Sequence, residues 1–221
     1  MMHKRGLLFD LDGTLTDSDH LHYAAFNVLL AREGRQLDHQ TFRSQVIGRA
    51  NAEIFAGLYP EASSAEHERL AAQKEADYRS LAKSLVPLAG LPGLLGLAAQ
   101  RGWACAVVTN GPRQNAEHSL QALGLAGGFQ LVISAIELAR SKPDPLPYQE
   151  ALRRLDLAPE HVVGFEDSVS GLRAGVDAGL AMVGITTGLE GAQLIAMGAR
   201  LAVADYSDPR LLPFIEARLG G

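Results

Sequence analysis

Short apolar runs recur along the chain, and segments whose apolar residues have helical spacing lie between most of them. The runs are rich in β-branched residues and nearly free of charge, which is typical of strands buried on both faces of a parallel sheet. Strands that alternate with helices in this way indicate an α/β fold with a doubly wound parallel sheet. The predicted strands span residues 6–9, 104–108, 131–134, 162–165, 182–186 and 201–204. The predicted helices between them span residues 93–101, 114–123, 147–155, 168–178 and 192–197.

One long segment departs from this alternation. Between Thr16 and Pro87 the spacing predicts helices alone, over residues 20–33, 40–47, 52–58 and 65–85. In the first of these helices the apolar stripe consists of Leu21, Ala25, Val28 and Leu29. The block follows the first strand directly, where a crossover helix would normally lie. We therefore expect an inserted all-helical cap of residues 16–87 on an α/β core of residues 1–15 and 88–221.

Length and composition fit one core domain with a modest insertion. The chain has 221 residues, of which 47% are hydrophobic and 20% are charged, so it can bury a sizeable core. Its formal charge of −5 argues against nucleic acid or an anionic membrane surface as a partner. The single cysteine excludes an internal disulfide, and Cys105 lies in an apolar run that is typical of a buried strand.

The sequence also predicts where the protein works. Asp10 interrupts the first apolar run, so this run does not resemble a signal peptide. The longest uncharged stretch, residues 85–99, is short and broken by proline and glycine, so it does not fit a membrane span. We expect a cytoplasmic protein with no membrane partner. We expect a monomer, although nothing in the sequence rules out a dimer.

Polar clusters follow the predicted strands where ligands gather in open parallel sheets, outside the carboxyl ends of the strands. Each cluster alone could be a helix cap or a turn. Together they would place several carboxylates side by side, and burying these without compensating charge is costly. The clusters are Asp10-Leu11-Asp12-Gly13-Thr14, Thr109-Asn110-Gly111, Ser141-Lys142-Pro143-Asp144-Pro145 and Glu166-Asp167-Ser168.

A divalent cation and a lysine would resolve this cost. Asp10, Glu166 and Asp167 offer hard oxygen ligands, to which Asp12 could add its backbone carbonyl, and such a set suits Mg²⁺ with a substrate phosphate completing the shell. Lys142 would offset the remaining negative charge and hold a phosphoryl oxygen. Thr109 and the amides near Asn110 would donate hydrogen bonds to the same group. No cluster of cysteine and histidine suggests zinc.

These motifs resemble those of the haloacid dehalogenase-like (HAD) superfamily over nearly the whole chain. They appear in the family's order: DxDGT at residues 10–14, then Thr109, then Lys142-Pro143, then Glu166-Asp167 before a serine. The resemblance implies a Rossmann-like core, Mg²⁺ as cofactor, a nucleophilic Asp10 that forms an aspartyl-phosphate, and Asp12 as general acid/base. The dehalogenases of the superfamily lack an aspartate at the position of Asp12, which makes dehalogenation a weak alternative.

A helical cap between the first two motifs resembles the branch that contains β-phosphoglucomutase, sugar phosphatases and phosphoglycolate phosphatase. Thr16, His22 and Lys74 match the mutase hinge, a histidine near the acid/base and a lysine that reaches substrate. Asn51 falls where the mutase has an arginine that grips a second phosphate, and Arg49 lies two residues earlier. We therefore expect Asn110, Thr16, His22, Arg49, Asn51 and Lys74 to bind substrate.

The resulting hypothesis is a phosphatase that acts on a small phosphorylated metabolite, a sugar or polyol phosphate. The first alternative is a sugar phosphomutase of the β-phosphoglucomutase type, which the replaced arginine disfavours. A receiver-like signalling domain shares a phosphorylated aspartate, an acidic pair, a threonine and a lysine, but it has no cap and no second aspartate. An inactive binding module is disfavoured because no motif residue is missing.

Overall fold

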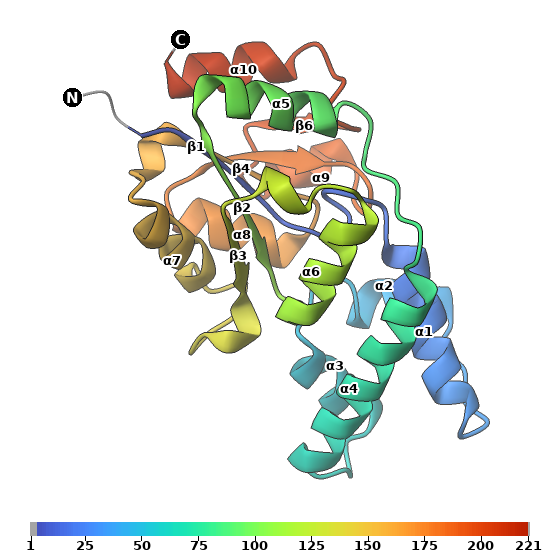
Figure 1. The fold of residues 1–221 in the computed structure, drawn as a ribbon. Helices are drawn as coiled ribbons and strands as arrows, with labels where there is room; N and C mark the ends of the chain where they lie inside the picture. Colours follow the sequence, from blue (N-terminus) through green and yellow to red (C-terminus); the bar gives the residue numbers. More distant parts are fainter. Residues whose placement is uncertain (1–3, 221) are drawn as a thin grey trace.

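A computed structural model describes residues 4–220 and contains a six-stranded sheet whose paired strands all run parallel (Figure 1). The strand order is β3-β2-β1-β4-β5-β6, so the chain reverses its direction of winding between β1 and β4. The strands are β1 (Gly6–Phe9), β2 (Ala104–Thr109), β3 (Leu131–Ser134), β4 (Val162–Glu166), β5 (Ala181–Ile185) and β6 (Leu201–Val203). The predicted doubly wound α/β fold is confirmed, with strand ends within one residue of the prediction.

Helices cover both faces of the sheet because alternate strand residues point to opposite sides. Leu7 and Phe9 of β1 pack on one face, against α5 (Leu91–Arg101), α6 (Arg113–Ala122) and α10 (Leu211–Leu219). On the other face Leu8 belongs to the core formed with α7 (Leu146–Leu155), α8 (Val169–Asp177) and α9 (Gly191–Ala196). Short 3-10 turns at Ala126–Gly128, Ala135–Glu137 and Pro159–His161 join these elements. No helix within residues 4–220 is long and apolar enough to cross a membrane.

The segment between β1 and α5 is all-helical, as expected, and has its own apolar core. Its helices are α1 (Asp19–Ala31), α2 (His39–Gln45), α3 (Asn51–Leu58) and α4 (Ser64–Leu81). They lie together beside one edge of the sheet (Figure 1). Phe26, Phe42 and Phe55 are buried at the centre of this cap. The predicted stripe of α1 was partly wrong: Val28 is 42% exposed, and Phe26 and Leu30 are buried in its place.

Two crossing chain segments connect the cap to the core. The Leu88 amide donates to the Leu15 carbonyl at 2.9 Å, and the Thr16 hydroxyl donates to the Val86 carbonyl at 2.8 Å. These bonds lie where we place the division between a cap of residues 16–87 and the core, which stays a prediction. Helix α4 ends at Leu81, earlier than predicted, because Ala82 has already left helical geometry.

Candidate active site

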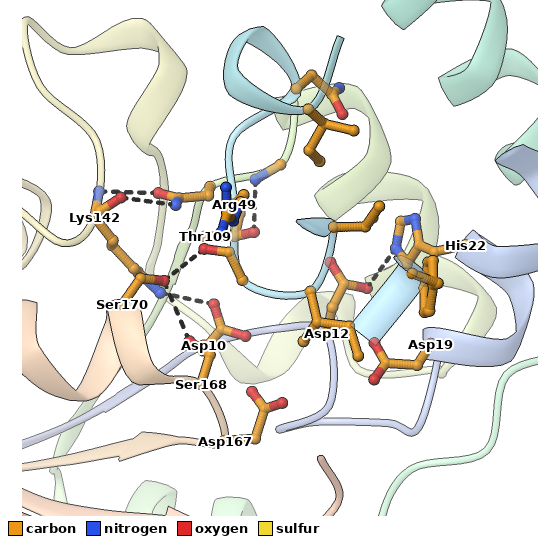
Figure 2. A pocket seen from close by; sticks show the side chains of 18 of the residues that line it. Asp10, Asp12, Asp19, His22, Arg49, Thr109, Lys142, Asp167, Ser168 and Ser170 are labelled. Atoms are coloured by element: carbon orange, nitrogen blue, oxygen red, sulfur yellow. Dashed lines mark hydrogen bonds and ion pairs between the residues drawn. The ribbon is translucent and has the colours of Figure 1, made fainter. Parts of the chain in front are cut away.

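The candidate site lies at the carboxyl ends of β1, β2 and β4, beneath the cap. Asp10 follows β1, and its backbone amide donates to the Phe165 carbonyl of β4 at 3.0 Å, which fixes the residue at the point where the strand order reverses. Ligands of open α/β sheets bind at such a point. A cavity of about 100 Å³ opens here, lined by the core residues Asp10, Asp12, Thr109, Asn110, Lys142 and Asp167 together with cap residues (Figure 2).

Lys142 is the cation at the centre of this site. Its side chain is buried, and Nζ donates to Oδ1 of Asp10 at 2.7 Å, to Oε1 of Glu166 at 2.6 Å and to the Val108 carbonyl at 2.7 Å. All three ammonium hydrogens are therefore used. Burial opposes the charge, but Asp10 and Glu166 outweigh burial and hold the pKa of Lys142 well above its usual value.

The backbone of Lys142 is held by Asn110. The side-chain oxygen of Asn110 accepts from the Lys142 amide at 3.1 Å, and its side-chain nitrogen donates to the Lys142 carbonyl at 3.2 Å. Asn110 lines the cavity, as the substrate-binding prediction requires. Its amide group, however, is paired with the Lys142 loop, so its side chain orients the lysine.

Glu166 and Asp167 continue the acidic cluster. One oxygen each of Asp10, Glu166 and Asp167 lie within 4.8 Å of one another, and all three residues are buried. Oε2 of Glu166 accepts from the backbone amides of Asp167 and Ser168, both at 3.1 Å, and from the Ser168 hydroxyl at 2.9 Å. With Oε1 bonded to Lys142, both oxygens of Glu166 are engaged by protein donors.

Two glycines make room for these carboxylates. Gly13 has a φ of 78°, in the left-handed region, and a Cβ there would overlap the carboxylate of Asp167. A Cβ on Gly171 would overlap the carboxylate of Glu166. The Thr14 hydroxyl donates to Oδ1 of Asp167 at 3.2 Å. The DxDGT sequence thus shapes the cluster as well as contributing to it.

The charge of the cluster fits a divalent cation. Burial and then the charge of Glu166 raise the pKa of Asp10 and of Asp167 well above their usual values, and at Asp10 the ammonium of Lys142 offsets this only in part. Three carboxylates and one ammonium would leave the site with excess negative charge. Because the donors are hard carboxylate oxygens, the residues present fit Mg²⁺ or a similar ion, held by Asp10 and Asp167.

Thr109 ends β2 beside Asp10. Its hydroxyl oxygen accepts from the Gly111 amide at 2.9 Å, and the Ser134 hydroxyl donates to the Gly111 carbonyl at 2.8 Å. These bonds fix the turn that begins at residue 109. Because Oγ1 acts as acceptor in the turn, its hydrogen can be donated to an oxygen bound in the cavity.

Asp12 points to the cap. Its Oδ1 accepts from the Ser18 hydroxyl at 2.6 Å and lies 3.2 Å from Nε2 of His22. Burial raises the pKa of Asp12, but its contacts with His22 and Ser18 and the nearby ammonium of Lys74 outweigh burial and lower that pKa to about 2. The carboxylate of Asp12 lies outside the acidic cluster. The predicted contact of Asp12 with a metal ion is therefore through its backbone carbonyl.

His22 and Lys74 form one hydrogen-bonded unit. Nζ of Lys74 lies 2.9 Å from Nδ1 of His22. An ammonium group has only hydrogens to offer, so Nδ1 is the acceptor and Nε2 carries the ring hydrogen that faces Asp12. Both residues line the cavity, but their polar atoms are partly paired with each other.

The other predicted cap residues differ in their placement. Arg49 and Asn51 line the cavity, whereas Thr16 is buried at the hinge and is not among the lining residues. Within residues 4–220 the guanidinium of Arg49 donates only to the Ser44 carbonyl, at 3.2 Å. Asn51 donates to Oε1 of Glu75 at 2.6 Å. Thr16 therefore makes a hinge contact, and its role in substrate binding stays a prediction.

Some residues that line the cavity are not predicted from the sequence. Asp19, in the first turn of α1, lies beside Asp12 in Figure 2, and burial raises its pKa to about 6. Glu75 also lines the cavity. The Ser170 hydroxyl donates to the Gly48 carbonyl at 2.5 Å and joins α8 of the core to the cap loop. Of these residues, only Asp19 could have been predicted, because it lies one helical turn before His22 on a predicted helix.

Known proteins share this architecture. The family model of haloacid dehalogenase-like hydrolases matches residues 4–179. A validoxylamine A 7'-phosphate phosphatase of Streptomyces hygroscopicus subsp. limoneus is 35% identical, over 81% of this chain and 84% of that protein. A β-phosphoglucomutase of Bacillus subtilis (strain 168) is 28% identical, over 92% and 91%. The crystal structure of CbbY from Rhodobacter sphaeroides with phosphate has a TM-score of 0.84 and 26% identity, covering 93% of this chain and 96% of that one.

The family match agrees with the family resemblance of the sequence motifs. The family match covers most of the chain, from the first strand to the end of α8. The chain belongs to the haloacid dehalogenase-like hydrolases and is an enzyme of that family, a phosphoric monoester hydrolase.

Proposed function

We propose that the enzyme is a Mg²⁺-dependent phosphatase that hydrolyses a small sugar or polyol phosphate through an aspartyl-phosphate on Asp10. One observation carries the proposal: Lys142 holds Oδ1 of Asp10 at 2.7 Å, while Oδ2 has no hydrogen-bond partner among residues 4–220. A carboxylate held by one oxygen, with the other unpartnered, suits nucleophilic attack on phosphorus.

Asp10 and Asp167, with the backbone carbonyl of Asp12, would hold the cation. When bound, the cation supplies positive charge that keeps Asp10 ionised and offsets the charge of the phosphoryl oxygens. Lys142 neutralises further negative charge at the nucleophile, and Thr109 donates its hydroxyl hydrogen to a phosphoryl oxygen. These contacts orient the phosphoryl group for in-line attack.

The two chemical steps divide between Asp10 and Asp12. In the first, an Asp10 oxygen forms a bond to phosphorus, the bond to the leaving alcohol breaks, and Asp12 gives its proton to that oxygen. In the second, Asp12 takes a proton from water, the water oxygen bonds to phosphorus and Asp10 is released. The low pKa of Asp12 suits the second step, and the negative charge of a bound phosphate would raise it for the first.

The cap favours hydrolysis over phosphoryl return. Asn51, at the position of the mutase arginine, is uncharged and donates to the carboxylate of Glu75, so residue 51 offers a second phosphate no cation. The phosphatase from S. hygroscopicus supports the same choice. Two observations favour the mutase alternative. Arg49 lines the cavity and has no carboxylate partner in the described part of the chain, and the B. subtilis mutase is similar to this chain.

A panel of phosphorylated metabolites, assayed with Mg²⁺ and with a chelator, tests the proposal. We expect phosphate release from at least one sugar or polyol phosphate, and loss of that activity on chelation. Supplied with β-glucose 1-phosphate, the enzyme should not form the isomer. Isomer formation without phosphate release would establish the mutase alternative, and activity that survives chelation would refute the metal assignment.

A further inference from the structure

Glu75 is a buried carboxylate on α4 that the mechanism above does not use. It is 5% exposed. Oε1 accepts from the side chains of Asn51 at 2.6 Å and Lys74 at 3.0 Å, and Oε2 accepts from the side-chain amide of Asn115. Asn115 belongs to α6 of the core, so Glu75 joins the cap to the core as well as to the cavity.

Glu75 is also the counter-charge of Lys74. Lys74 is 3% exposed, and Glu75 is its only carboxylate ion-pair partner among residues 4–220. The same ammonium donates to Nδ1 of His22 at 2.9 Å. A buried ammonium without a carboxylate is costly, so the contact that orients His22 depends on Glu75.

The His22 ring is held at both nitrogens and on one face. It stacks on the Tyr78 ring at 4.0 Å between centroids, with the planes 7° apart. The Tyr78 hydroxyl in turn lies 3.1 Å from the hydroxyl of Ser119 on α6. Hydrogen bonds from α4 to Asn115 and to Ser119 of α6 thus support the histidine that faces Asp12.

We propose that Glu75 is a positioning residue for Asp12: paired with Lys74, it keeps Nδ1 of His22 an acceptor and Nε2 the donor to Asp12. Asn115 makes this arrangement depend on contact of α4 with α6, so the acid/base is oriented when the cap rests on the core. The proposal rests on the proposed function for the role of Asp12. Its structural part, the tautomer of His22, holds whatever the substrate.

The variant Glu75→Gln tests the inference, because it keeps the shape and removes the charge. Without the carboxylate, the buried ammonium of Lys74 loses its charge partner and is expected to turn toward solvent, so that Nδ1 of His22 loses its donor. We expect ring ¹⁵N signals of His22 to report a protonated Nε2 in the wild-type chain and a mixture of tautomers in the variant. An unchanged ring in the variant would overturn the proposal without bearing on the phosphatase activity.

Leaving groups provide the second readout. p-Nitrophenolate departs without a proton, whereas a sugar alkoxide needs one. We therefore expect Glu75→Gln to lower kcat/KM by about 10-fold or more for the best sugar phosphate of the panel, part of the worth of a positioned acid. For p-nitrophenyl phosphate the value should change far less. Equal losses on both substrates would indicate a merely structural role and overturn the proposal.

Asp77→Asn is the matched control on the same helix. Asp77 forms a two-pronged ion pair with Arg32, at 2.8 Å for each contact, away from the cavity. The control should keep the tautomer of His22 and the ratio of the two substrates. Asn115→Ala removes the donor to Glu75 on the core side, together with the acceptor of Arg79 at 2.6 Å, and should lower the sugar phosphate rate in the same direction but less. No selective loss in this variant would refute the role of Asn115.

Discussion

Nζ of Lys142 lies 2.7 Å from Oδ1 of Asp10 and donates a hydrogen bond to it, although the two residues are 132 positions apart. Both are buried. The same ammonium bonds Glu166, so one cation compensates two carboxylates in the protein interior. Removing a single partner from such a group leaves charge that nothing else in the site offsets.

Lys142→Met should therefore destabilise the protein. The side chain fits the same space, but Asp10 and Glu166 lose their shared cation, and breaking a buried pair in this way costs about 3–5 kcal/mol. Chemical denaturation of the metal-free protein measures the change. Lys4→Met is the control, because Lys4 pairs with Asp156 on the surface, where an ion pair contributes at most about 1 kcal/mol. Equal effects of the two substitutions would contradict the central role of Lys142.

Asp10→Asn should abolish turnover and phosphoenzyme formation. The amide cannot act as the nucleophile, and the substitution also removes the negative charge that attracts Lys142 and the cation. Acid-quenched mass spectrometry after mixing with substrate should find the phosphoryl group in the wild-type chain and none in the variant. Asp17→Asn, an exposed change nearby, should behave as wild type. Appreciable turnover by the Asp10 variant would refute the assignment.

Asp12→Asn should slow turnover without removing the nucleophile. A positioned acid/base is worth at least about 10²-fold in rate, and the loss should be larger for an alkyl phosphate than for p-nitrophenyl phosphate. The variant should still form the phosphoenzyme from p-nitrophenyl phosphate, because that leaving group needs no proton. Steady-state rates on both substrates measure the split, and a near-normal rate on the alkyl phosphate would remove Asp12 from the role.

The sheet and its site motifs could be predicted because local patterns encode them. An apolar run that ends in a polar cluster identifies a strand and its carboxyl end together, and parallel strands bring these ends to one edge. Helix α10 was missed because Pro213 interrupts its pattern. The apolar residues Leu211, Ile215 and Leu219 nevertheless have helical spacing. A proline is tolerated in the first turn because the backbone amides there have no carbonyl partner within the helix.

The cap contacts could not be predicted because they depend on how two separately encoded parts meet. Glu75 and its partner Asn115 are 40 residues apart, and Asn51 is 24 residues from Glu75. No periodicity relates these positions. Lys74 and His22 match positions of the family and could be assigned to the site from that resemblance. Their hydrogen bond to each other could not be predicted in this way. Local sequence specifies the helices of the cap, whereas docking on the core specifies these pairs.

Gly171→Ala, a change in α8, should displace the carboxylate of Glu166 and thereby disturb the site. The added Cβ would overlap the carboxylate of Glu166, which is bonded to Lys142 and to the start of α8. We expect lower thermal stability and lower activity, measured by a melting curve and by turnover. Gly96→Ala is the matched control, since Gly96 lies in α5 with open space around its Cβ. That change should raise stability by about 1 kcal/mol, and a similar gain at Gly171 would contradict the crowding.

Asp19 should make the stability of the metal-free protein fall as pH rises. Burial raises its pKa to about 6 from a usual 3.8, so between these values the folded chain binds more protons at this residue than the unfolded chain. Stability attributable to Asp19 is therefore full below pH 3.8 and lost as pH rises to about 6. Asp19→Asn, which carries no charge at any pH, should be more stable than the wild-type chain above pH 6.

Melting curves across pH in the presence of a chelator measure this difference. The gain of the Asp19 variant should shrink as pH falls through 6 and vanish near the usual pKa of an aspartate, because the wild-type carboxyl is then neutral in both states. Asp17→Asn is the control, since Asp17 is exposed two residues away and its removal changes the net charge by the same amount. If both substitutions give the same pH dependence of stability, the change in net charge causes the effect, and the burial of Asp19 beside Asp12 does not.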